Sequence, residues 1–390
     1  MRLAYVTDQI LPRRATDTFQ LISMASALGR VGADVTVVAP ARRGRPPADP
    51  AEIADYYGVE ASFRVEAVRS IYPLFFRGLE KVAHAFAMLK SDAVRRGDVL
   101  YTRNLPIVTC ALTAGRIPVV YETYRPWPEW NPSSKFFFDW VGGRENFLGA
   151  ILHSNHARDS YARTRIDVSR LLTAYNGFDL RSMEPRLSKE EARAAVGLPA
   201  DVPVAVYVGS VSIAKGIGEI LSIARLMPDV RFILVGSEGK GTIEEEANGL
   251  PNVTIVGWRP LAEAAPFLQA ADVLVIPPSS RPLREVGNTV LPIKTFMYLA
   301  AGRAILAPAT PDVSEVLTDG VNAVLVQPDD AAQAARRLRE LLENPHYMEK
   351  LGRAAANHAS GFTWEKRAQK VLAFMEERLH DYRPKDHREL

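Results

Sequence analysis

The sequence contains few of the features that mark secreted or membrane proteins. Its 390 residues include a single cysteine, Cys110, which excludes a disulfide framework and a thiolate metal cluster. No stretch offers the roughly 18 uncharged apolar residues that a membrane-spanning helix needs. Asp8 interrupts the first apolar run, so the N-terminus does not read as a signal peptide. We therefore expect a cytoplasmic protein, with peripheral binding at the inner face of a membrane as the alternative.

Several catalytic motifs are also missing. The sequence has no Asp-x-Asp motif, which argues against a divalent metal that bridges a diphosphate. It has no Gly-x-x-x-x-Gly-Lys-Ser/Thr motif, which excludes an ordinary P-loop nucleotidase. His153 and His156 are three residues apart, but no carboxylate or thiolate cluster makes them a zinc site. We expect no metal and no bound cofactor.

The net charge is small and unevenly distributed. It is +3, in a chain with 47% hydrophobic and 24% charged residues, which is typical of a globular protein. Residues 1–180 contain 23 Lys and Arg against 18 Asp and Glu, whereas residues 181–390 contain 25 against 27. This difference is either ordinary solvated surface or a preference of the first half for an anionic partner or a membrane surface. We expect no nucleic-acid partner.

Short apolar runs alternate with helical periods along the whole chain, which predicts parallel sheets with crossover helices. The predicted strands of the first half are residues 3–6, 35–39, 99–102, 119–121, 150–152 and 171–174. Those of the second half are residues 204–208, 232–235, 253–256, 273–276, 304–307 and 323–326. The predicted helices include residues 18–31, 80–95, 218–226, 261–270, 293–301 and 331–343. Near-continuous apolar strands indicate sheets that are buried on both faces.

A polar, proline-containing stretch separates the two halves. We predict an N-terminal Rossmann-like domain at residues 1–180, an interdomain linker at 181–203 and a second Rossmann-like domain at 204–363. Residues 364–390 are predicted to form a C-terminal amphipathic helix and tail. The predicted fold class is α/β, with two doubly wound domains that face a central cleft.

Residues 291–308, LPIKTFMYLAAGRAILAP, are the most informative stretch. They predict a short helix that ends at Gly302, followed by a buried strand. Lys294 lies in the first turn of this helix, where free backbone N–H groups and the helix dipole favour an anion. Asn288, Thr289 and Val290 lie just before it.

A second cationic turn lies earlier in the same domain. A strand leads into Gly209 and Ser210, and Lys215 opens the following helix. Two such turns fit a diphosphate better than a single carboxylate, although a surface lysine beside a helix start is the simpler reading of Lys215. The next two strands end at Gly236 and Gly257, and ligands lie beyond the carboxyl ends of such strands. Trp258 follows Gly257 and either borders the ligand or is an ordinary partly buried aromatic residue.

These stretches resemble the donor site of retaining glycosyltransferases of family 4, the group 1 type, which have the GT-B fold. The resemblance implies a nucleotide diphosphate sugar as donor, with Lys215 and Lys294 on the diphosphate. It implies donor contacts at Gly209, Ser210, Gly236, Gly257, Trp258, Asn288, Thr289, Val290 and Met297. It also implies that the terminal helix crosses back to the first domain.

The chain departs from this family where two glutamates separated by seven residues are usual. Thr289 and Met297 occupy these positions, and a thioether cannot accept ribose hydrogen bonds as a carboxylate does. Ser210 stands where an arginine is common, which removes one bidentate contact. The residues present therefore support phosphate binding better than ribose binding.

The first domain carries the candidate acceptor-side residues and two candidate catalytic residues, Glu122 and Tyr124, which join Lys215 and Lys294 as the predicted catalytic set. Tyr124 stands where the family usually has a histidine that contacts the sugar, and Glu122 either orients an acceptor hydroxyl or is a satisfied structural carboxylate. Arg103 follows the predicted strand at residues 99–102 and is better placed for the cleft. The loop of residues 7–18 has no glycine, and its Arg13 and Arg14 either meet an anionic acceptor or form an ordinary charged loop.

Aromatic residues gather at residues 72–86 and 121–140, the second group including Trp127. Helical spacing favours core packing for the first group. The second lies in a loop broken by prolines, where a hydrophobic or glycan acceptor would fit.

We therefore expect a metal-independent, retaining hexosyltransferase in polysaccharide or glycoconjugate synthesis. It would use a UDP- or GDP-type sugar and a glycan, lipid-linked or small-molecule acceptor. One alternative is a non-catalytic family member that acts as a binding or partner subunit. Another is an isomerase or hydrolase that acts on the nucleotide sugar itself, for which Glu122 is the one suitable acid.

Overall fold

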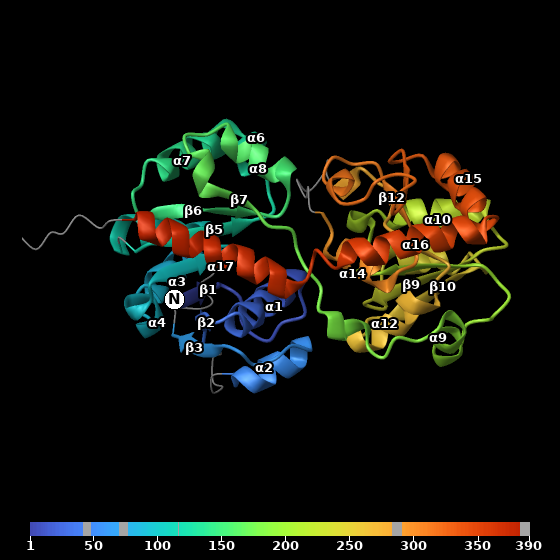
Figure 1. Cartoon of the computed structure of the whole chain (residues 1–390), viewed down its shortest axis with the longest axis horizontal. Helices are drawn as coiled ribbons and strands as arrows, with labels where there is room; N and C mark the ends of the chain where they lie inside the picture. Colours follow the sequence, from blue (N-terminus) through green and yellow to red (C-terminus); the bar gives the residue numbers. More distant parts are fainter. Residues whose placement is uncertain (42–47, 70–76, 116, 283–290, 383–390) are drawn as a thin grey trace, which may run out of the picture. The chain divides into compact units, whose positions relative to one another are not determined.

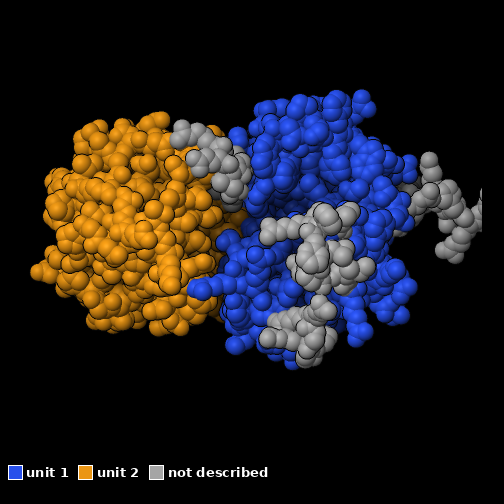
Figure 2. All heavy atoms as spheres, turned by 180° about the vertical axis from the view of Figure 1, so that it is seen from behind, with its two compact units in different colours: residues 1–175, 364–390 blue, residues 176–363 orange. Residues whose placement is uncertain are grey.

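The computed structural model describes residues 1–41, 48–69, 77–115, 117–282 and 291–382. The chain divides into two compact units (Figure 2). The first unit comprises residues 1–175 and 364–390, and the second comprises residues 176–363. No helix within the described ranges is both long and apolar enough to cross a membrane.

The first unit contains a seven-stranded parallel sheet in the order β3-β2-β1-β4-β5-β6-β7. Its strands are β1 (Arg2–Val6), β2 (Asp34–Pro40), β3 (Arg64–Val68), β4 (Val99–Thr102), β5 (Val119–Thr123), β6 (Phe147–Leu152) and β7 (Leu171–Thr173). Its helices are α1 (Thr16–Arg30), α2 (Pro50–Tyr57), α3 (Arg77–Met88), α4 (Asp92–Arg96), α5 (Leu105–Cys110), α6 (Trp127–Trp130), α7 (Pro132–Gly142), α8 (Asn155–Ala162) and α17 (Trp364–Asp381).

The second unit contains a six-stranded parallel sheet in the order β10-β9-β8-β11-β12-β13. Its strands are β8 (Val204–Val208), β9 (Arg231–Ser237), β10 (Val253–Gly257), β11 (Val273–Val275), β12 (Ala304–Pro308) and β13 (Val324–Val326). Its helices are α9 (Lys189–Ala195), α10 (Ile217–Leu226), α11 (Thr242–Ala247), α12 (Leu261–Ala270), α14 (Ile293–Ala301), α15 (Ala331–Leu342) and α16 (Pro345–Ala359). The predicted α/β class with two Rossmann-like domains is confirmed.

Both faces of the first sheet are covered, as near-continuous apolar strands require. Along β1, Leu3 and Tyr5 belong to the core on one face, while Ala4 and Val6 belong to the core on the other. Successive side chains of a strand point to opposite faces, so one short apolar run serves both cores.

The C-terminal helix α17 belongs to the first unit, as the resemblance implies. It packs against α1 (Figure 1), and its buried Ala368, Val371 and Met375 share one core with Leu21 and Leu28 of α1. The chain therefore leaves the first unit after residue 175 and returns to it at residue 364.

The predicted linker at residues 181–203 is ordered and lies within the second unit. Its helix α9 packs on α12. The buried Arg193 pairs with Asp272, and Lys189 lies 3.0 Å from the same carboxylate. These ion pairs attach α9 to Asp272, which directly precedes β11 of the second sheet.

Two features of the first unit differ from the prediction. The single helix predicted at residues 80–95 is two helices, because the Ser91 side chain accepts a hydrogen bond from the Val94 amide and starts α4. The strand β3 was not predicted. It lies at the sheet edge and is only partly buried, so its sequence, RVEAV, lacks a continuous apolar run.

Candidate functional site

Two glycines bring the ends of β8 and β9 into close contact in the second unit. Gly209 and Gly236 have φ angles of 147° and 118°, which side-chain-bearing residues rarely adopt. A Cβ atom on Gly236 would lie 2.3 Å from the Gly209 carbonyl oxygen. A Cβ atom on Gly209 would lie 2.6 Å from Nζ of Lys294. Only glycine therefore fits at either position, and the packing leaves the backbone beside the Lys294 ammonium.

Lys294 lies in the first turn of α14, as predicted, and is half-buried. Its Nζ lies 3.6 Å from the centroid of the Tyr207 ring, a cation–π contact, and the Tyr207 hydroxyl donates to the Ser210 carbonyl at 2.8 Å. No ion pair to Lys294 occurs within the described ranges. Burial and the nearby charge of Lys215 hold the pKa of Lys294 well below its usual range.

The second predicted lysine, Lys215, is exposed and follows a strand as expected. It precedes Gly216, which has a φ of 75° and caps the N-terminus of α10. A Cβ atom on Gly216 would lie 2.5 Å from Cβ of Ser279. The charge of Lys215 contributes to the lowered pKa of Lys294, so the fold brings the two side chains near each other, and an anion between them would relieve their repulsion.

The other predicted donor residues lie on the same edge of the sheet where they are described. Gly257 ends β10, and the Trp258 amide donates to the Ser237 carbonyl at 2.9 Å. The Trp258 side chain is 40% exposed, which leaves its ring accessible. Met297 is buried within α14. Asn288, Thr289 and Val290 lie outside the described residues.

An anchoring contact at this edge was not predicted. Asp329 accepts hydrogen bonds from Ser279 Oγ at 3.2 Å and from the Ser280 amide at 2.9 Å. It has a φ of 62°, which is unusual for a residue with a side chain. These bonds tie the loop after β11 to the segment that precedes α15, and they hold Ser279, which lies against Gly216. A sequence signal for this contact is lacking, because Asp329 reads as an ordinary residue before a helix.

In the first unit, Glu122 is buried, with four donors around its carboxylate. Tyr5 donates at 3.0 Å, His153 Nε2 lies at 2.6 Å and Arg367 Nη2 at 2.8 Å, and the Tyr101 hydroxyl also donates. Although burial opposes ionisation, Arg367 and His153 hold the pKa of Glu122 well below its usual range. This environment favours the structural carboxylate over a residue that orients an acceptor.

His153, in turn, has its pKa lowered to about 4, mainly by burial, so it is neutral near pH 7. Its Nδ1 lies 3.3 Å from Gln20 Nε2, and Gln20 Oε1 accepts from Arg103 at 2.6 Å. A continuous polar chain thus joins the Glu122 carboxylate to Arg103. His153 was missed as a structural partner because only the strand register places it beside Glu122.

The structure brings a predicted acceptor-side residue, Arg103, close to a predicted catalytic residue, Tyr124. The Arg103 guanidinium lies 5.7 Å from the Tyr124 ring centroid. Trp127 is half-buried and donates to the Tyr121 hydroxyl at 3.1 Å. Arg13 and Arg14 are exposed, and Tyr57 holds the Arg13 backbone. Over the described part of the chain, no group of three or more His, Cys, Asp or Glu residues could hold a metal ion.

Two family models match the sequence. The model described as glycosyltransferase family 4 matches residues 20–182, and the model described as glycosyl transferases group 1 matches residues 202–344. Together the two matches span most of the chain. The chain belongs to the group 1 glycosyltransferases of family 4.

Curated relatives of this family carry one recurring name. The D-inositol 3-phosphate glycosyltransferase of Thermobifida fusca is 29% identical over 232 residues, which are 55% of this chain and 51% of that protein. The protein of the same name from Mycobacterium avium is 26% identical over 238 residues, or 58% and 54%. The chain thus spans about half the length of the curated relatives it matches.

The fold of this chain resembles that of several solved structures over nearly its whole length. Sucrose-phosphate synthase from Thermosynechococcus elongatus superposes with a TM-score of 0.77 at 17% identity, covering 97% of this chain and 99% of that one. HepE from Anabaena, in complex with UDP and glucose, gives 0.73 at 18% identity, covering 96% and 99%. These likenesses confirm the predicted GT-B fold.

The Glu122–Arg367 ion pair gives a stability prediction for this family member. Arg367→Met leaves a buried carboxylate without its cation, so the free energy of unfolding of the first unit should fall by about 3–5 kcal/mol. Urea denaturation followed by tryptophan fluorescence reports this, because Trp127, Trp130, Trp140 and Trp364 lie in that unit. Lowering the pH should reduce the difference in free energy of unfolding between the variant and the unmodified protein. Protonation of Glu122 removes the unpaired charge in the variant, and it weakens the ion pair in the unmodified protein.

Lys370→Met is the matched control, since this exposed lysine of α17 makes one hydrogen bond, to the Thr173 carbonyl. Its effect should stay below about 1 kcal/mol. Equal losses in the Arg367 and Lys370 variants would contradict the importance of the buried pair.

Proposed function

We propose that this protein is a glycosyltransferase that moves a sugar from a nucleotide diphosphate sugar to an acceptor, with retention of configuration and without a metal ion. The observation that carries the proposal is the half-buried Lys294, which lies beside Lys215 and has no ion-pair partner within the described ranges. Membership in family 4 supports the same activity. HepE, a protein of the same fold, was solved with UDP-glucose, which supports a UDP-type donor.

The chemistry follows from the charges at the strand ends. As the bond between sugar and diphosphate breaks, negative charge grows on the leaving diphosphate. Lys215, Lys294 and the backbone beside Gly209 are positioned to stabilise that charge. An acceptor hydroxyl would pass its proton largely to the leaving phosphate, so the mechanism needs no dedicated protein base. This agrees with the occupied hydrogen-bonding positions of Glu122.

On the acceptor side, the proposal uses the exposed or half-buried residues Arg103, Tyr124 and Trp127, with Arg13 and Arg14 at the loop after β1. The acceptor is a glycan, a lipid-linked sugar or a small molecule. The proposed location is the cytoplasm, and no cofactor beyond the nucleotide sugar is required. The names of the relatives favour this transferase over a non-catalytic subunit or an isomerase.

The first test is the diphosphate contact itself. Lys294→Ala and Lys215→Ala should each weaken UDP or GDP binding by about 1.5–3 kcal/mol, the range for hydrogen bonds to charged groups. Calorimetric titration with both nucleotides measures this and identifies the preferred base. Lys350→Ala, at an exposed position of α16, is the control and should bind normally. Unchanged binding in both test variants would remove the donor-site assignment.

A second test concerns metal independence, which rests on the missing Asp-x-Asp motif. Sugar transfer or donor hydrolysis should continue in excess EDTA at an unchanged rate. Loss of activity with EDTA and its return with Mg²⁺ or Mn²⁺ would show that a metal bridges the diphosphate.

The third test addresses Met297, which stands where relatives have a ribose-binding glutamate. If the nucleotide lies as in the family, Met297→Glu supplies an ionised acceptor and should tighten nucleotide binding by about 1.5–3 kcal/mol. If the ribose lies elsewhere, the same carboxylate is buried without a partner, and the melting temperature should fall instead. Measuring both affinity and melting temperature separates these outcomes, and a lower melting temperature with no gain in affinity contradicts the ordinary donor position.

A further inference from the structure

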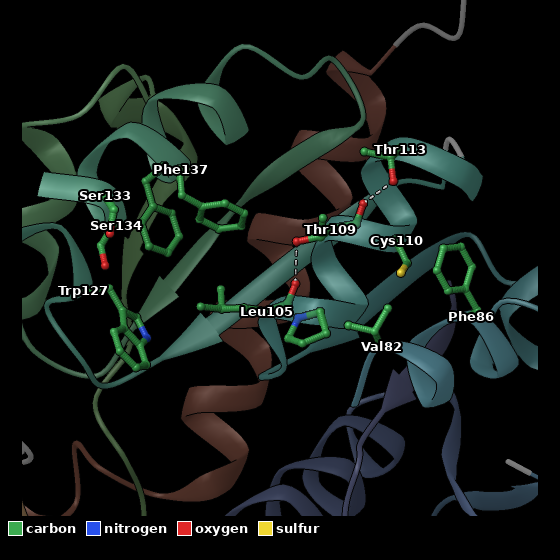
Figure 3. A pocket seen from close by; sticks show the side chains of 12 residues that line it. Val82, Phe86, Leu105, Thr109, Cys110, Thr113, Trp127, Ser133, Ser134 and Phe137 are labelled. Atoms are coloured by element: carbon green, nitrogen blue, oxygen red, sulfur yellow. Dashed lines mark hydrogen bonds between the residues drawn. The ribbon is translucent and has the colours of Figure 1, made fainter. Parts of the chain in front are cut away.

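An apolar groove of about 600 Å³ lies within the first unit, among α3, α5, α6 and α7. This volume is in the range of small-molecule binding sites. Figure 3 shows the lining side chains in a band that runs from Trp127 at one end to Val82 and Phe86 at the other. Leu105, Thr109 and Cys110 lie between these ends.

Three of the hydroxyl groups in the wall of this groove, those of Thr109, Thr113 and Ser133, donate hydrogen bonds to nearby protein atoms. The Thr109 and Thr113 hydroxyls donate to helix carbonyls one turn earlier, at 2.9 and 2.7 Å (Figure 3). The Ser133 hydroxyl donates to Asn131 at 2.6 Å. These hydroxyls have donated their hydrogens to the protein, so the surface offered to a ligand is largely hydrocarbon and aromatic.

Two large apolar side chains of α3, at the end of the groove away from Trp127, are partly exposed to solvent. Val82 is 43% exposed and Phe86 is 50% exposed, on the same face of α3. Exposed apolar surface that lines a groove, rather than scattered single residues, marks a site where an apolar partner is bound. The lining side chains lie along a band (Figure 3), an arrangement that favours an elongated chain over a compact ring.

A cation lies next to the other end of the groove: Arg125 does not line the groove itself but stacks on Trp127, which does. The Arg125 guanidinium is 5.1 Å from the ring centroid of Trp127, which lines the groove, and 5.4 and 5.5 Å from those of Tyr124 and Trp130. Its Nε donates to the Tyr124 hydroxyl at 3.2 Å. In the part of the chain that the structure describes, Arg125 makes no ion pair with a carboxylate. Three rings thus hold a positive charge at a half-buried position.

We propose that this groove binds a lipid phosphate, with its hydrocarbon chain between Trp127 and Phe86 and its phosphate at Arg125. The site is complementary to both parts of such a lipid. The apolar wall of the groove matches the hydrocarbon chain, and the Arg125 guanidinium matches the phosphate. Tyr124, a proposed acceptor-side residue, contacts Arg125, so the head group lies beside it. Resting on the proposed function, this identifies the acceptor class as a phosphate-containing lipid.

The test uses dodecyl phosphate below its micelle concentration, titrated calorimetrically into the full chain without any nucleotide. Dodecyl phosphate should bind, and both dodecanol and inorganic phosphate should bind at least about tenfold more weakly. Arg125→Gln should weaken binding by roughly 10- to 100-fold, the equivalent of a lost hydrogen bond to a charged group. Phe86→Ser should weaken it by about three- to tenfold, since its half-exposed ring can bury only part of a side chain's apolar surface.

Two controls separate a built site from general stickiness. Phe136→Ser removes an aromatic residue that is 73% exposed and does not line the groove, and Arg95→Gln removes a surface arginine of α4. Both should bind the probe as the unmodified protein does. Equal loss in Phe136→Ser and Phe86→Ser would overturn the proposal, as would equal affinity for dodecanol and dodecyl phosphate. Melting temperatures of all four variants identify any that fail to fold, and Arg125→Gln, at a partly exposed position, tests the phosphate end independently of Phe86.

A further arm separates a single bound lipid from a membrane surface. Binding to phosphatidylglycerol vesicles without binding of monomeric dodecyl phosphate would contradict the groove assignment. Measuring UDP binding by the same protein preparations distinguishes failure of the donor-site proposal from failure of the lipid-site proposal. Loss of UDP binding bears on the donor site, whereas loss of dodecyl phosphate binding with UDP binding intact overturns only the lipid site.

Discussion

In each unit every strand runs in the same direction, so every strand delivers its following loop to one edge of its sheet. This constraint positions all the candidate chemistry. In the second unit it gathers Gly209, Gly236 and Trp258 at the edge where Lys294 begins its helix. In the first unit it places Arg103 after β4 and Tyr124 after β5. Residues distant in sequence become neighbours because the carboxyl ends of parallel strands all lie at the same edge of the sheet.

The predictable part of this structure is the part that depends on local pattern. Buried strands in both units follow from short apolar runs, and the start of α14 follows from its position between a polar turn and Gly302. The edge strand β3 could not be predicted, because an edge position relaxes the demand for continuous apolar residues. The break before α4 depends on one hydrogen bond of Ser91, which competes with an otherwise unbroken helical period.

The parts that escaped prediction depend on contacts between distant residues. Glu122 could be read from sequence as a catalytic acid or as a structural carboxylate. The choice depends on Arg367, which lies 245 residues later in the chain, and on His153, which directly follows the adjacent strand β6. Likewise, Arg125 is one charge among many until three aromatic rings are found around it. A local motif indicates which residues have the chemistry for catalysis or binding. The side chains that contact them in the fold determine whether their charges and hydrogen-bonding groups are open to a ligand.

The return of α17 to the first unit has a consequence for how the protein is made. The second unit is continuous in sequence and has all of its residues once position 363 has been synthesised. The first unit must wait for the last helix, which carries both a large share of its core and the cation for Glu122. Domains of a growing chain usually fold from the N-terminus onward. Here the N-terminal half is translated first and completed last, so a ribosome that stops before residue 364 releases a chain with one finished domain and one that lacks its closing helix.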